Sequence, residues 1–526
     1  SSVLATGEVQ ESSNTYLDNN VIETITGTLL ISTPAFSAAG QPYAFVNFEK
    51  GLGATAAKRS LLYYWDNFLN WDEITRVTEN DHVTNELVHG EGTASVSGTG
   101  VTGTSTLWTQ HVQPDDDWKC NADVDSEYGN IASVNSNTSL TLTSSYGGSG
   151  CGGAAAYSIR KNISVTGRYA GSAGVADGST LNGWAMLITS QEIPRIYDGS
   201  NLFDMNSVST VAVITTHKNR WFVANSRANP NRVWWSPVNS TAAWNSTAFE
   251  DVPNGHTEIV KLLSDGSSLL VFSRYGKVHR IFGEFDTAVG RPTHILEVQV
   301  PYNLGEIGGR TITRYNNAIW FLASTGLYAM LGSDFKLMGR NLERLIKTRA
   351  DTAYINSDTL TAPGNEYKLF AGVNENRYFL QLDDITGILD TSGNITIKHS
   401  TINYQGGFAH FNNRFVTGTD EILRLLRFNA PVYHDLGSLT STSPINISYI
   451  SNSYCGDHIE HKKEFRDFYI QYEQDAPSTS APTNRMLFDY VVDDTSTFVA
   501  SFSTISLNGF QGVIGLHTHP IGAIGN

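Results

Sequence analysis

Residues 218–236 read KNRWFVANSRANPNRVWWS: a turn, an aromatic strand, a second turn and another aromatic strand. Runs of aromatic and β-branched residues bounded by Gly, Asn, Asp and Pro are typical of β-hairpins. The same order of turns and strands recurs in four later stretches: SSLLVFSRYGKVHRIFG (267–283), NNAIWFLASTGLYAML (316–331), NEYKLFAGVNENRYFLQL (365–382) and NRFVTGTDEILRLL (413–426). The chain therefore contains a repeated antiparallel unit.

The repeat has a nearly constant period. The spacings between equivalent strand centres are 49, 49, 51 and 45 residues, counted from Trp221 through Leu270, Ile319 and Phe370 to Phe415. A period of this length is close to that of one β-propeller blade. A small sheet cannot bury both of its faces alone, so neighbouring units are expected to stack around an axis. We therefore predict a β-propeller.

Composition supports an all-β protein with more than one domain. The 526 residues include 47 Gly and 11% aromatic residues, but only 16% charged residues. This composition suits short strands joined by many tight turns. A chain of this length exceeds the size at which one hydrophobic core keeps growing, so we expect two or three domains.

The net charge is strongly negative, because 35 Lys and Arg residues face 51 Asp and Glu residues and leave a charge of −16. Proteins that grip nucleic acid neutralise phosphates with Lys and Arg, so a basic binding groove is not expected. The same acidity is compatible with a passage through which DNA slides without sticking, and also with solubility alone.

Cysteine usage and hydropathy indicate where the chain is made. Three cysteines, Cys120, Cys151 and Cys455, are too few for a disulfide framework in a chain this long. Cys120 and Cys151 are able to pair within one small domain, but the odd count and sparse usage favour reduced thiols. No signal-peptide pattern and no apolar run of about 18 residues stands out. We expect a soluble chain, made in the cytoplasm, with no membrane-spanning segment.

Composition changes twice along the chain and so divides it into three parts. A Gly-, Ser- and Thr-rich stretch of alternating strands interrupts the propeller-like pattern, and longer strands follow that pattern. We predict a discontinuous β-propeller at 1–88 and 161–440 and an inserted small β domain at 89–160. The C-terminal β region, 441–526, is predicted to complete the propeller or to form a closing β-sandwich, with an extended tail.

Two further elements are predicted within the propeller. The strand-like runs TGTLLISTP (26–34) and PYAFVNFEK (42–50) are both assigned to the first blade. A helix is predicted after the N-cap residue Asn341, with Arg344, Lys347 and Arg349 toward its C-terminal end, as an ordinary connection between blades.

No motif in the sequence predicts catalysis or cofactor binding. GxSxG, a P-loop, the dinucleotide fingerprint and CxxC are all absent. His517 and His519 would share one face of a strand, but no third ligand stands near them. Asp115 to Asp117 lack the spacing of a Ca²⁺ loop and are interpreted as a solvated turn. We expect no catalytic residue, no cofactor, no metal and no enzymatic activity.

Aromatic side chains remain as candidates for an interaction site. Trp234 and Trp235 are adjacent, so they face opposite sides of their strand. Together with Trp244, they are possible contacts for a protein or a sugar at the propeller rim. The alternative interpretation is that these side chains pack between sheets.

Four segments between residues 190 and 335 carry a resemblance to a known family. They are RIYDG, HKNRWFVA with RVWWSPVNSTAAW, EIVKLLSDGSSLLVFSRYGKVHRIFG and GEIGGRTITRYNNAIWFLASTGLYAM. In this order they resemble the β-propeller of bacteriophage tail nozzle and DNA-stabilisation proteins, with weaker similarity to residue 475. The inserted stretch, GTASVSGTGVTGTSTLWTQHVQPDDDW followed by TSLTLTSSY, resembles a small β module found in many phage virion proteins.

The resemblance implies a structural virion protein without catalytic residues. It implies self-association into a ring, as a hexamer, below the portal and the adaptor in the phage tail. The ring would form part of the DNA ejection channel and dock tail fibres. The implied partners are head-to-tail adaptor or connector proteins, tail fibre proteins, and DNA that passes without sequence-specific binding. The implied location is the virion tail, after synthesis in the host cytoplasm.

Two alternatives remain open from the sequence, because propellers host many functions. The first is a receptor-binding or glycan-binding propeller of the phage tail, in which Trp235 and Trp244 stack on sugars. The second is a secreted propeller hydrolase or lyase of glycans, in which inward carboxylates converge at the axis. Binding of host polysaccharide would support the first, and its cleavage would support the second.

Overall fold

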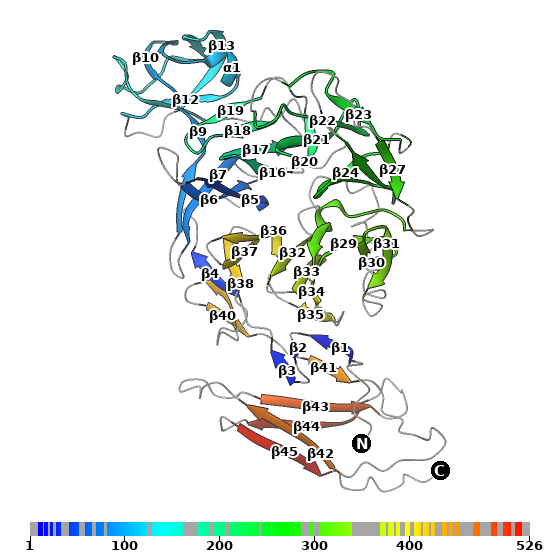
Figure 1. Cartoon of the computed structure of the whole chain (residues 1–526). Coiled ribbons are helices and arrows are strands. Elements are labelled where there is room, and N and C mark those ends of the chain that lie inside the picture. Colours follow the sequence, from blue (N-terminus) through cyan, green and yellow to red (C-terminus); the bar gives the residue numbers. More distant parts are fainter. Residues whose placement is uncertain are drawn as a thin grey trace. The chain divides into compact units, whose positions relative to one another are not determined.

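The computed structural model consists almost entirely of β-strands (Figure 1). It divides into two compact units, Ser1–Ser451 and Asn452–Asn526. The residues that the structure describes are 9–13, 15–18, 21–24, 28–32, 42–51, 58–65, 70–77, 82–123, 128–160, 176–189, 193–205, 208, 210–240, 244–253, 255, 257–283, 285, 294–298, 300, 304–338, 369–374, 377–382, 385–389, 395–399, 404–411, 414–419, 422–426, 434–438, 441–444, 448–451, 467–473, 485–491, 498–506 and 511–517.

The first unit is a β-propeller built from four-stranded antiparallel meanders, called blades below. Six of them are separate sheets, and a seventh lies inside a six-stranded sheet. The first two blades are β5 (Pro42–Lys50), β6 (Lys58–Trp65), β7 (Asn70–Val77) and β8 (His82–Glu86), then β16 (Ala176–Leu181), β17 (Trp184–Thr189), β18 (Arg195–Tyr197) and β19 (Leu202–Asp204). The third and fourth are β20 (Val211–His217), β21 (Arg220–Ser226), β22 (Arg232–Trp235) and β23 (Phe249–Asp251), then β24 (Ile259–Asp265), β25 (Ser268–Ser273), β26 (Val278–Phe282) and β27 (His294–Val298).

The remaining blades follow the same plan. The fifth and sixth are β28 (Thr313–Tyr315), β29 (Ala318–Ala323), β30 (Gly326–Leu331) and β31 (Asp334–Met338), then β32 (Leu369–Asn374), β33 (Arg377–Leu382), β34 (Ile385–Leu389) and β35 (Ile395–His399). The seventh is β36 (Tyr404–Phe411), β37 (Arg414–Thr419), β38 (Ile422–Leu426) and β4 (Thr28–Ser32). The prediction of an all-β propeller is therefore confirmed.

Tight turns between the first and second strands of two blades explain why these sequences form hairpins. Lys218 and Asn219 both have positive φ, 46° and 56°, between β20 and β21. Asn316 and Asn317, with φ of 46° and 63°, form the equivalent turn between β28 and β29. Two consecutive positive φ values match the right-handed twist of the flanking strands, and Asn tolerates them better than most residues. The local sequence thus fixes the register of each hairpin.

Hydrophobic contacts join each blade to the next. Pairs of residues that share a core cluster or a ring contact across successive seams are Phe48 with Tyr197, Ile188 with Trp221, Phe222 with Val271, Phe272 with Phe321, Trp320 with Tyr378, and Phe379 with Phe415. The seventh seam brings β36 beside β5. Each blade therefore buries both faces against its neighbours, as radial repetition requires.

The ring is closed by an N-terminal strand. β4 pairs antiparallel with β38, so residues 28–32 supply the outer strand of the seventh blade, while the next strand, β5, is the inner strand of the first blade. The assignment of the run 26–34 to the first blade is therefore wrong. Among the described strands after β38, none is one of the four strands of a blade, although β41 (Ser448–Ser451) joins the sheet of the sixth blade through β1 (Val9–Ser13). Whether the region 441–526 completes the propeller or forms a closing β-sandwich stays a prediction. A strand shared between the two chain ends links the first and last blades.

The predicted repeat was shifted by one strand in one blade. Trp221, Leu270, Ile319 and Phe415 lie on the second strand of their blades, but Phe370 lies on β32, which is the first strand. The hairpin NEYKLFAGVNENRYFLQL contains a first and a second strand, whereas the other four contain a second and a third. Because every hairpin of a meander has the same turn-and-strand pattern, sequence similarity alone does not distinguish these positions.

A separate β domain follows the first blade. Its strands, β9 (Val88–His89), β10 (Thr93–Ser97), β11 (Gly100–Thr104), β12 (Asp117–Cys120), β13 (Gly129–Ser136), β14 (Ser139–Leu142) and β15 (Tyr157–Arg160), form a seven-stranded sheet with the short helix α1 (Trp108–His111). The domain has its own core, which includes Trp108, Trp118 and Tyr157. In Figure 1 these strands lie beside the second blade, and β9 and α1 both contact β19.

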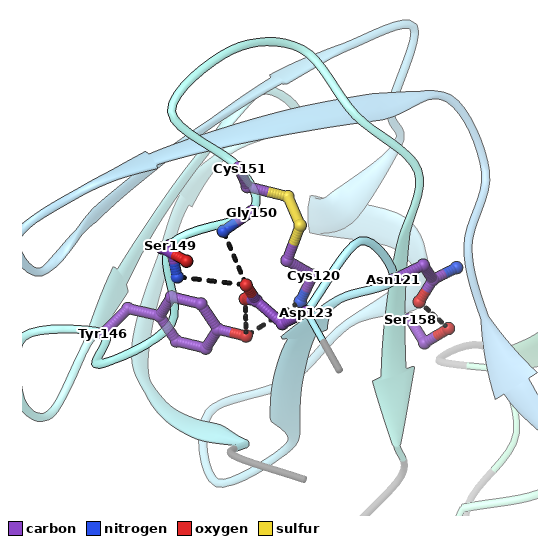
Figure 2. Close-up of a disulfide and its surroundings, with 8 residues drawn as sticks. All are labelled: Cys120, Asn121, Asp123, Tyr146, Ser149, Gly150, Cys151 and Ser158. Carbon is purple, nitrogen blue, oxygen red and sulfur yellow. Dashed lines mark hydrogen bonds between the residues drawn. A yellow bond between two sulfur atoms is a disulfide. The ribbon is translucent and has the colours of Figure 1, made fainter. Parts of the chain in front are cut away.

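A disulfide crosses this domain. Cys120 and Cys151 are bonded, with their Cα atoms 5.9 Å apart (Figure 2). The expectation of reduced thiols is therefore wrong for these two residues. Next to the disulfide, the Asp123 carboxylate accepts hydrogen bonds from Tyr146 Oη at 2.7 Å and from the amides of Ser149 and Gly150 (Figure 2). These contacts hold the loop before Cys151 against the end of β12.

The N-terminal and C-terminal segments form further sheets. β1 (Val9–Ser13) pairs in parallel with β35 and antiparallel with β41 (Ser448–Ser451), and so extends the sheet of the sixth blade. Two small hairpins are also present, β2 (Thr15–Asp18) with β3 (Val21–Thr24) and β39 (His434–Ser438) with β40 (Ser441–Pro444). In the second unit, β42 (Asp467–Glu473) pairs with β45 (Gln511–His517), and β43 (Arg485–Val491) pairs with β44 (Phe498–Ser506). The helix predicted after Asn341 and the extended tail lie outside the described residues.

Candidate functional site

The inner edges of the blades are a candidate position for a site, because the blades of a propeller converge on its axis. Lys261 on β24 forms an ion pair with Asp177 on β16, with 3.1 Å between Nζ and Oδ2. Their strands lie on either side of β20, so this pair spans the inner edge of the third blade. Ser179 and Thr216 approach to 3.5 Å beside it. The Asp177 carboxylate is therefore engaged by an ammonium group.

A second charged side chain, that of Arg310, also lies at the inner edges of the blades. Arg310 lies in η2 (Gly309–Thr311), which precedes the fifth blade. A methyl group placed on Gly407 of the seventh blade would lie 3.8 Å from Arg310 Nη2 and 3.8 Å from Phe45 Cδ2 of the first blade. The Arg310 guanidinium therefore lies near the inner strands of the seventh and first blades.

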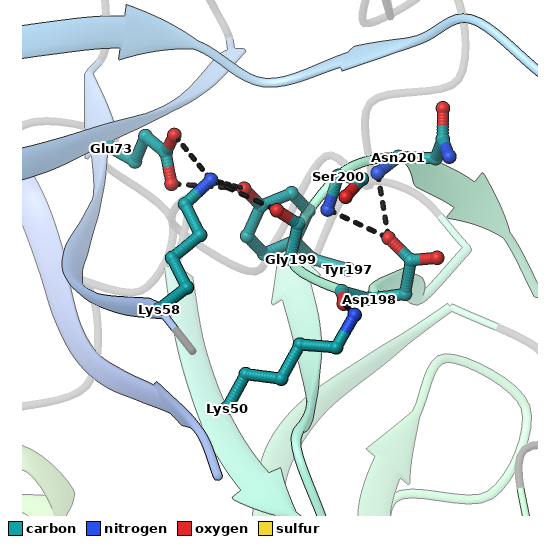
Figure 3. A network of polar contacts seen from close by, with 8 residues as sticks. All are labelled: Lys50, Lys58, Glu73, Tyr197, Asp198, Gly199, Ser200 and Asn201. Atoms are coloured by element: carbon teal, nitrogen blue, oxygen red, sulfur yellow. Dashed lines mark hydrogen bonds and ion pairs between the residues drawn. The ribbon is translucent and has the colours of Figure 1, made fainter. Parts of the chain in front are cut away.

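A network of polar contacts joins the first and second blades (Figure 3). Lys58 Nζ on β6 donates to Glu73 Oε1 at 2.7 Å, to Tyr197 Oη at 2.5 Å and to the Gly199 carbonyl at 2.9 Å. Tyr197 Oη in turn donates to Glu73 Oε2 at 2.9 Å. The Glu73 side chain is only 5% exposed, so both of its oxygens are satisfied inside the protein. We call Lys58, Glu73 and Tyr197 the blade joint.

Burial of the blade joint controls its protonation. Desolvation, followed by the charge of Glu73 and the hydrogen bond to it, raises the pKa of Tyr197 well above its ordinary value. The Tyr197 hydroxyl therefore stays protonated at all moderate pH values and acts as a hydrogen-bond donor to Glu73. The three ammonium donors of Lys58 are all used, so this joint presents no free acid, base or nucleophile.

The turn after β18 connects the blade joint to the inserted domain. Asp198 Oδ1 accepts the amides of Ser200 and Asn201, both at 2.7 Å, and the Asp198 carbonyl accepts Lys50 Nζ at 2.9 Å (Figure 3). Asn201 Oδ1 accepts the amide of Gly90 at 3.1 Å, at the start of the inserted domain. One turn therefore holds the first blade, the second blade and the inserted domain together.

Glycine is required in this turn. Gly199 has a φ of +95°, a conformation that L side chains rarely adopt. A methyl group at Gly199 would also lie 3.2 Å from Lys50 Cδ and 3.3 Å from the ring of Phe48. The RIYDG segment of the sequence is therefore explained by its place at this three-way contact.

Aromatic packing adds to the same contact. His111 of α1 lies 4.7 Å from the ring of Phe203 on β19, measured between centroids, and His89 lies 5.6 Å from that ring. His89 is fully buried. The inserted domain is thus held against the second blade by packed rings as well as by the hydrogen bond of Asn201.

A similar charged contact joins the fourth and fifth blades. Asp265 accepts Arg280 Nη1 at 3.0 Å on one oxygen and Arg314 Nη2 at 3.0 Å on the other. Arg280 also donates to the Gly332 carbonyl at 3.0 Å. Since Arg314 and Gly332 belong to the fifth blade, these ionisable groups again connect neighbouring blades.

The hydroxyl of Tyr197 is expected to stabilise the propeller measurably. Tyr197→Phe removes one donor from a buried carboxylate and one acceptor from Lys58, so the free energy of unfolding should fall by about 1–3 kcal/mol. Urea denaturation followed by circular dichroism measures this change. Tyr275→Phe is the matched control, because Tyr275 is 60% exposed and its substitution should change little. Equal stability of the Tyr197→Phe protein and the wild type would contradict a stabilising role of the blade joint.

The aromatic candidates from the sequence have different environments. Trp235 is fully buried in the core between the third and fourth blades, and Trp244 is buried in the core between the second and third. Neither is placed to stack on a sugar, so the structure contradicts that use of these two side chains. Trp234 is partly buried, and the Arg232 guanidinium lies 5.8 Å from its ring. The alternation of Trp234 and Trp235 across the strand is as expected.

Metal ligation was not expected from the sequence, and among the described residues no group of three or more His, Cys, Asp or Glu side chains is placed to hold a metal ion. Asp116 is buried rather than solvated, and its carboxylate accepts the Gln113 amide at 3.0 Å to close a turn. His519 and the side chain of His517 lie outside the described residues.

No helix in the described part of the chain is long and apolar enough to cross a membrane.

Sequence reasoning missed the blade joint. Glu73 is 124 residues from Tyr197, and no local spacing links the two. The one available signal was RIYDG, where a Gly after Asp indicates a turn with positive φ. The Lys and Glu partners of that turn are set by the packing of one blade on another.

Comparisons with known proteins return propeller structures. No protein-family model and no curated protein matches the sequence. BamB from Moraxella catarrhalis is 14% identical, with a TM-score of 0.31, over 49% of this chain and 84% of that chain. Virginiamycin B lyase from Staphylococcus aureus is 12% identical, with a TM-score of 0.34, over 64% and 94%. The Pan2 WD40 domain of Neurospora crassa is 6% identical, with a TM-score of 0.30, over 64% and 88%. Likeness at these values does not bear on function.

Proposed function

We propose that this chain is a non-enzymatic structural protein of a bacteriophage tail. It assembles as a ring, with six copies, below the portal and the adaptor. The ring surrounds part of the DNA ejection path, and the outer surfaces of its subunits dock tail fibres. The sequence resemblance to tail nozzle propellers and to a phage virion β module is the basis of this proposal.

The observation that best supports this proposal is that charged side chains bind one another across the contacts between blades. The blade joint and the Asp265 contact both connect neighbouring blades, and the turn of Asp198 adds the inserted domain. An enzyme needs groups that converge on a substrate, whereas these groups converge on one another. A rigid disc with a firmly attached side domain suits a part that must keep its shape under load.

Charged side chains lie at the inner edges of the propeller: Arg310, and the ion pair of Lys261 with Asp177. In the proposed ring, DNA runs between subunits through the centre of the ring, rather than through the axis of a single propeller. The net charge of −16 on each chain would limit the adhesion of DNA to the inner surface of the proposed ring.

The glycan-binding alternative used Trp235 and Trp244, and both side chains are buried. The hydrolase or lyase alternative named no particular carboxylate, and Asp177, at the inner edge, is paired with Lys261.

Electron microscopy of the chain mixed with connector proteins from the same virion tests the proposal. We expect a ring of propellers seated on the connector, with the inserted domains visible as separate density. A matched incubation with the connector of an unrelated phage controls for non-specific stacking. Single particles that bind host polysaccharide and ignore both connectors would instead support the glycan-binding propeller.

A further inference from the structure

Two buried histidines lie in the same seam between the third and fourth blades. This seam contains Phe222 and Trp235 from the third blade. It also contains Val271, Ile281 and Phe285 from the fourth blade, where Phe285 follows β26. Both His217 and His279 belong to strands of these two blades.

His217 ends β20 and is 3% exposed. Its ring lies 5.7 Å from that of Phe222 and 5.8 Å from that of Phe285, with edge-on geometry. Nδ1 is 2.8 Å from the hydroxyl of Ser264 on β24, and Nε2 has no hydrogen-bond partner. Burial, with a smaller effect of the neighbouring Lys218, lowers the pKa of His217 to about 4.

His279 lies in the middle of β26 and is fully buried. It pairs across the sheet with Val271, and Ile281 follows it on the same face, so strand alternation directs it into the seam. Neither ring nitrogen has a hydrogen-bond partner. Burial lowers the pKa of His279, Lys277 lowers it further, and Glu297 on β27 opposes the shift.

Among the residues that the structure describes, few charged groups face these rings. Lys218 acts on His217 and Lys277 acts on His279, and both repel an added positive charge. The described carboxylates on this side of the two blades are Glu297, which is exposed, and Glu250 of β23, which lies opposite Val233 on the seam side. Glu297 pairs with Lys277 at 3.8 Å, and Glu250 does not shift either imidazole. An imidazolium inside the seam would therefore be poorly compensated.

We propose that this seam is a proton-sensitive joint, which opens in mildly acidic solution when His217 and His279 take up protons while the other described seams stay closed. The other charged contacts between blades, at the blade joint and at Asp265, hold paired charges that do not depend on a neutral imidazole. The inference is independent of the proposed function.

The direction and size of the pH effect on the opening of the seam follow from proton linkage. The unfolded or opened chain has a His pKa near 6.5, and the closed seam holds His217 near 4, so the open form binds more protons between these values. Stability from the seam is complete above about pH 6.5 and is lost as the pH falls toward 4. For His217 alone, the opening equilibrium at pH 5 should rise by about 30-fold over its value at neutral pH.

Hydrogen exchange with mass spectrometry at pH 7.5 and pH 5.0 tests the proposal, after correction for intrinsic exchange rates. Peptides from β20, β21 and β26 should lose protection at pH 5.0, while peptides from β29 and β30 of the fifth blade should not. This comparison needs only the wild-type protein. Unchanged protection of β20 and β26, or equal loss in all blades, would overturn the proposal.

Variants identify the groups responsible. His217→Asn with His279→Leu should remove the acid response, because both positions then lack a titrating group. His410→Asn is the control, because His410 is exposed on β36 and its substitution should leave the response intact. An acid response of normal size in the double variant would reject these two histidines as the cause. Where His279→Leu fails to fold, His217→Asn alone should reduce the opening at pH 5.0 by about 30-fold.

Discussion

Replacing Trp235 with alanine is expected to lower the free energy of unfolding of the propeller by about 3–5 kcal/mol. The Trp235 ring is fully buried between two blades, 5.3 Å from the ring of Phe285 and 6.3 Å from that of Phe222. Its removal would leave a large cavity in a seam that rigid sheets on both sides keep from collapsing. Urea denaturation monitored by circular dichroism measures the loss.

The neighbouring tryptophan provides a matched control. Trp234 lies on the opposite face of the same strand and is only partly buried, so Trp234→Ala should cost roughly 1 kcal/mol. A site for sugar stacking would give a different result, because Trp235→Ala would then abolish binding and leave stability unchanged. Equal small losses for both substitutions would show that Trp235 does not fill the seam.

Removing the disulfide is expected to destabilise the inserted domain by about 3–4 kcal/mol, because the bond closes a loop with a sequence separation of 31 residues. The double substitution Cys120→Ala and Cys151→Ala frees this loop and also removes two fully buried side chains from the core of the domain. Calorimetry of the full chain should show the unfolding transition of the inserted domain at a lower temperature. The transition of the propeller should stay in place.

Two controls accompany this experiment. Cys455→Ala removes the third cysteine, which lies outside residues 88–160, and should leave the transition of the inserted domain unchanged. Treatment of the wild type with dithiothreitol should reproduce the effect of the double substitution without changing the sequence. A double variant that melts together with the wild type would show that the core around Trp108 and Trp118 suffices without the bond.

Hairpins and the propeller class followed from the sequence because both depend on local chemistry. Paired residues such as Lys218 with Asn219 specify a tight turn, and the flanking aromatic residues specify a strand. The boundaries of a blade are known only when each hairpin is assigned to the first and second strands or to the second and third strands of its meander. The hairpin around Phe370 has the same local pattern as the others, so the sequence does not make this assignment. The local pattern therefore predicted the fold class, but it assigned Phe370 to the wrong strand of its blade.

Long-range contacts could not be predicted from one sequence. β4 pairs with β38, nearly 400 residues later, and no local feature of residues 28–32 indicates that partner. Glu73 and Tyr197 meet only because two blades pack face to face. The cysteine count argued for reduced thiols, yet the fold of a small domain brings Cys120 and Cys151 together. Full burial of Trp235 and only partial burial of Trp234 likewise depend on which face meets the next blade.

Native mass spectrometry of the purified chain, over a range of concentrations, tests the central claim most directly. The chain has a mass of 57.5 kDa, and the proposed ring of six copies predicts a discrete species of about 345 kDa, which is six times that mass. Such a species, with few intermediates, is the expected result. A single 57.5 kDa species at every concentration, alone and with the connector, would contradict a ring-forming part of a phage tail.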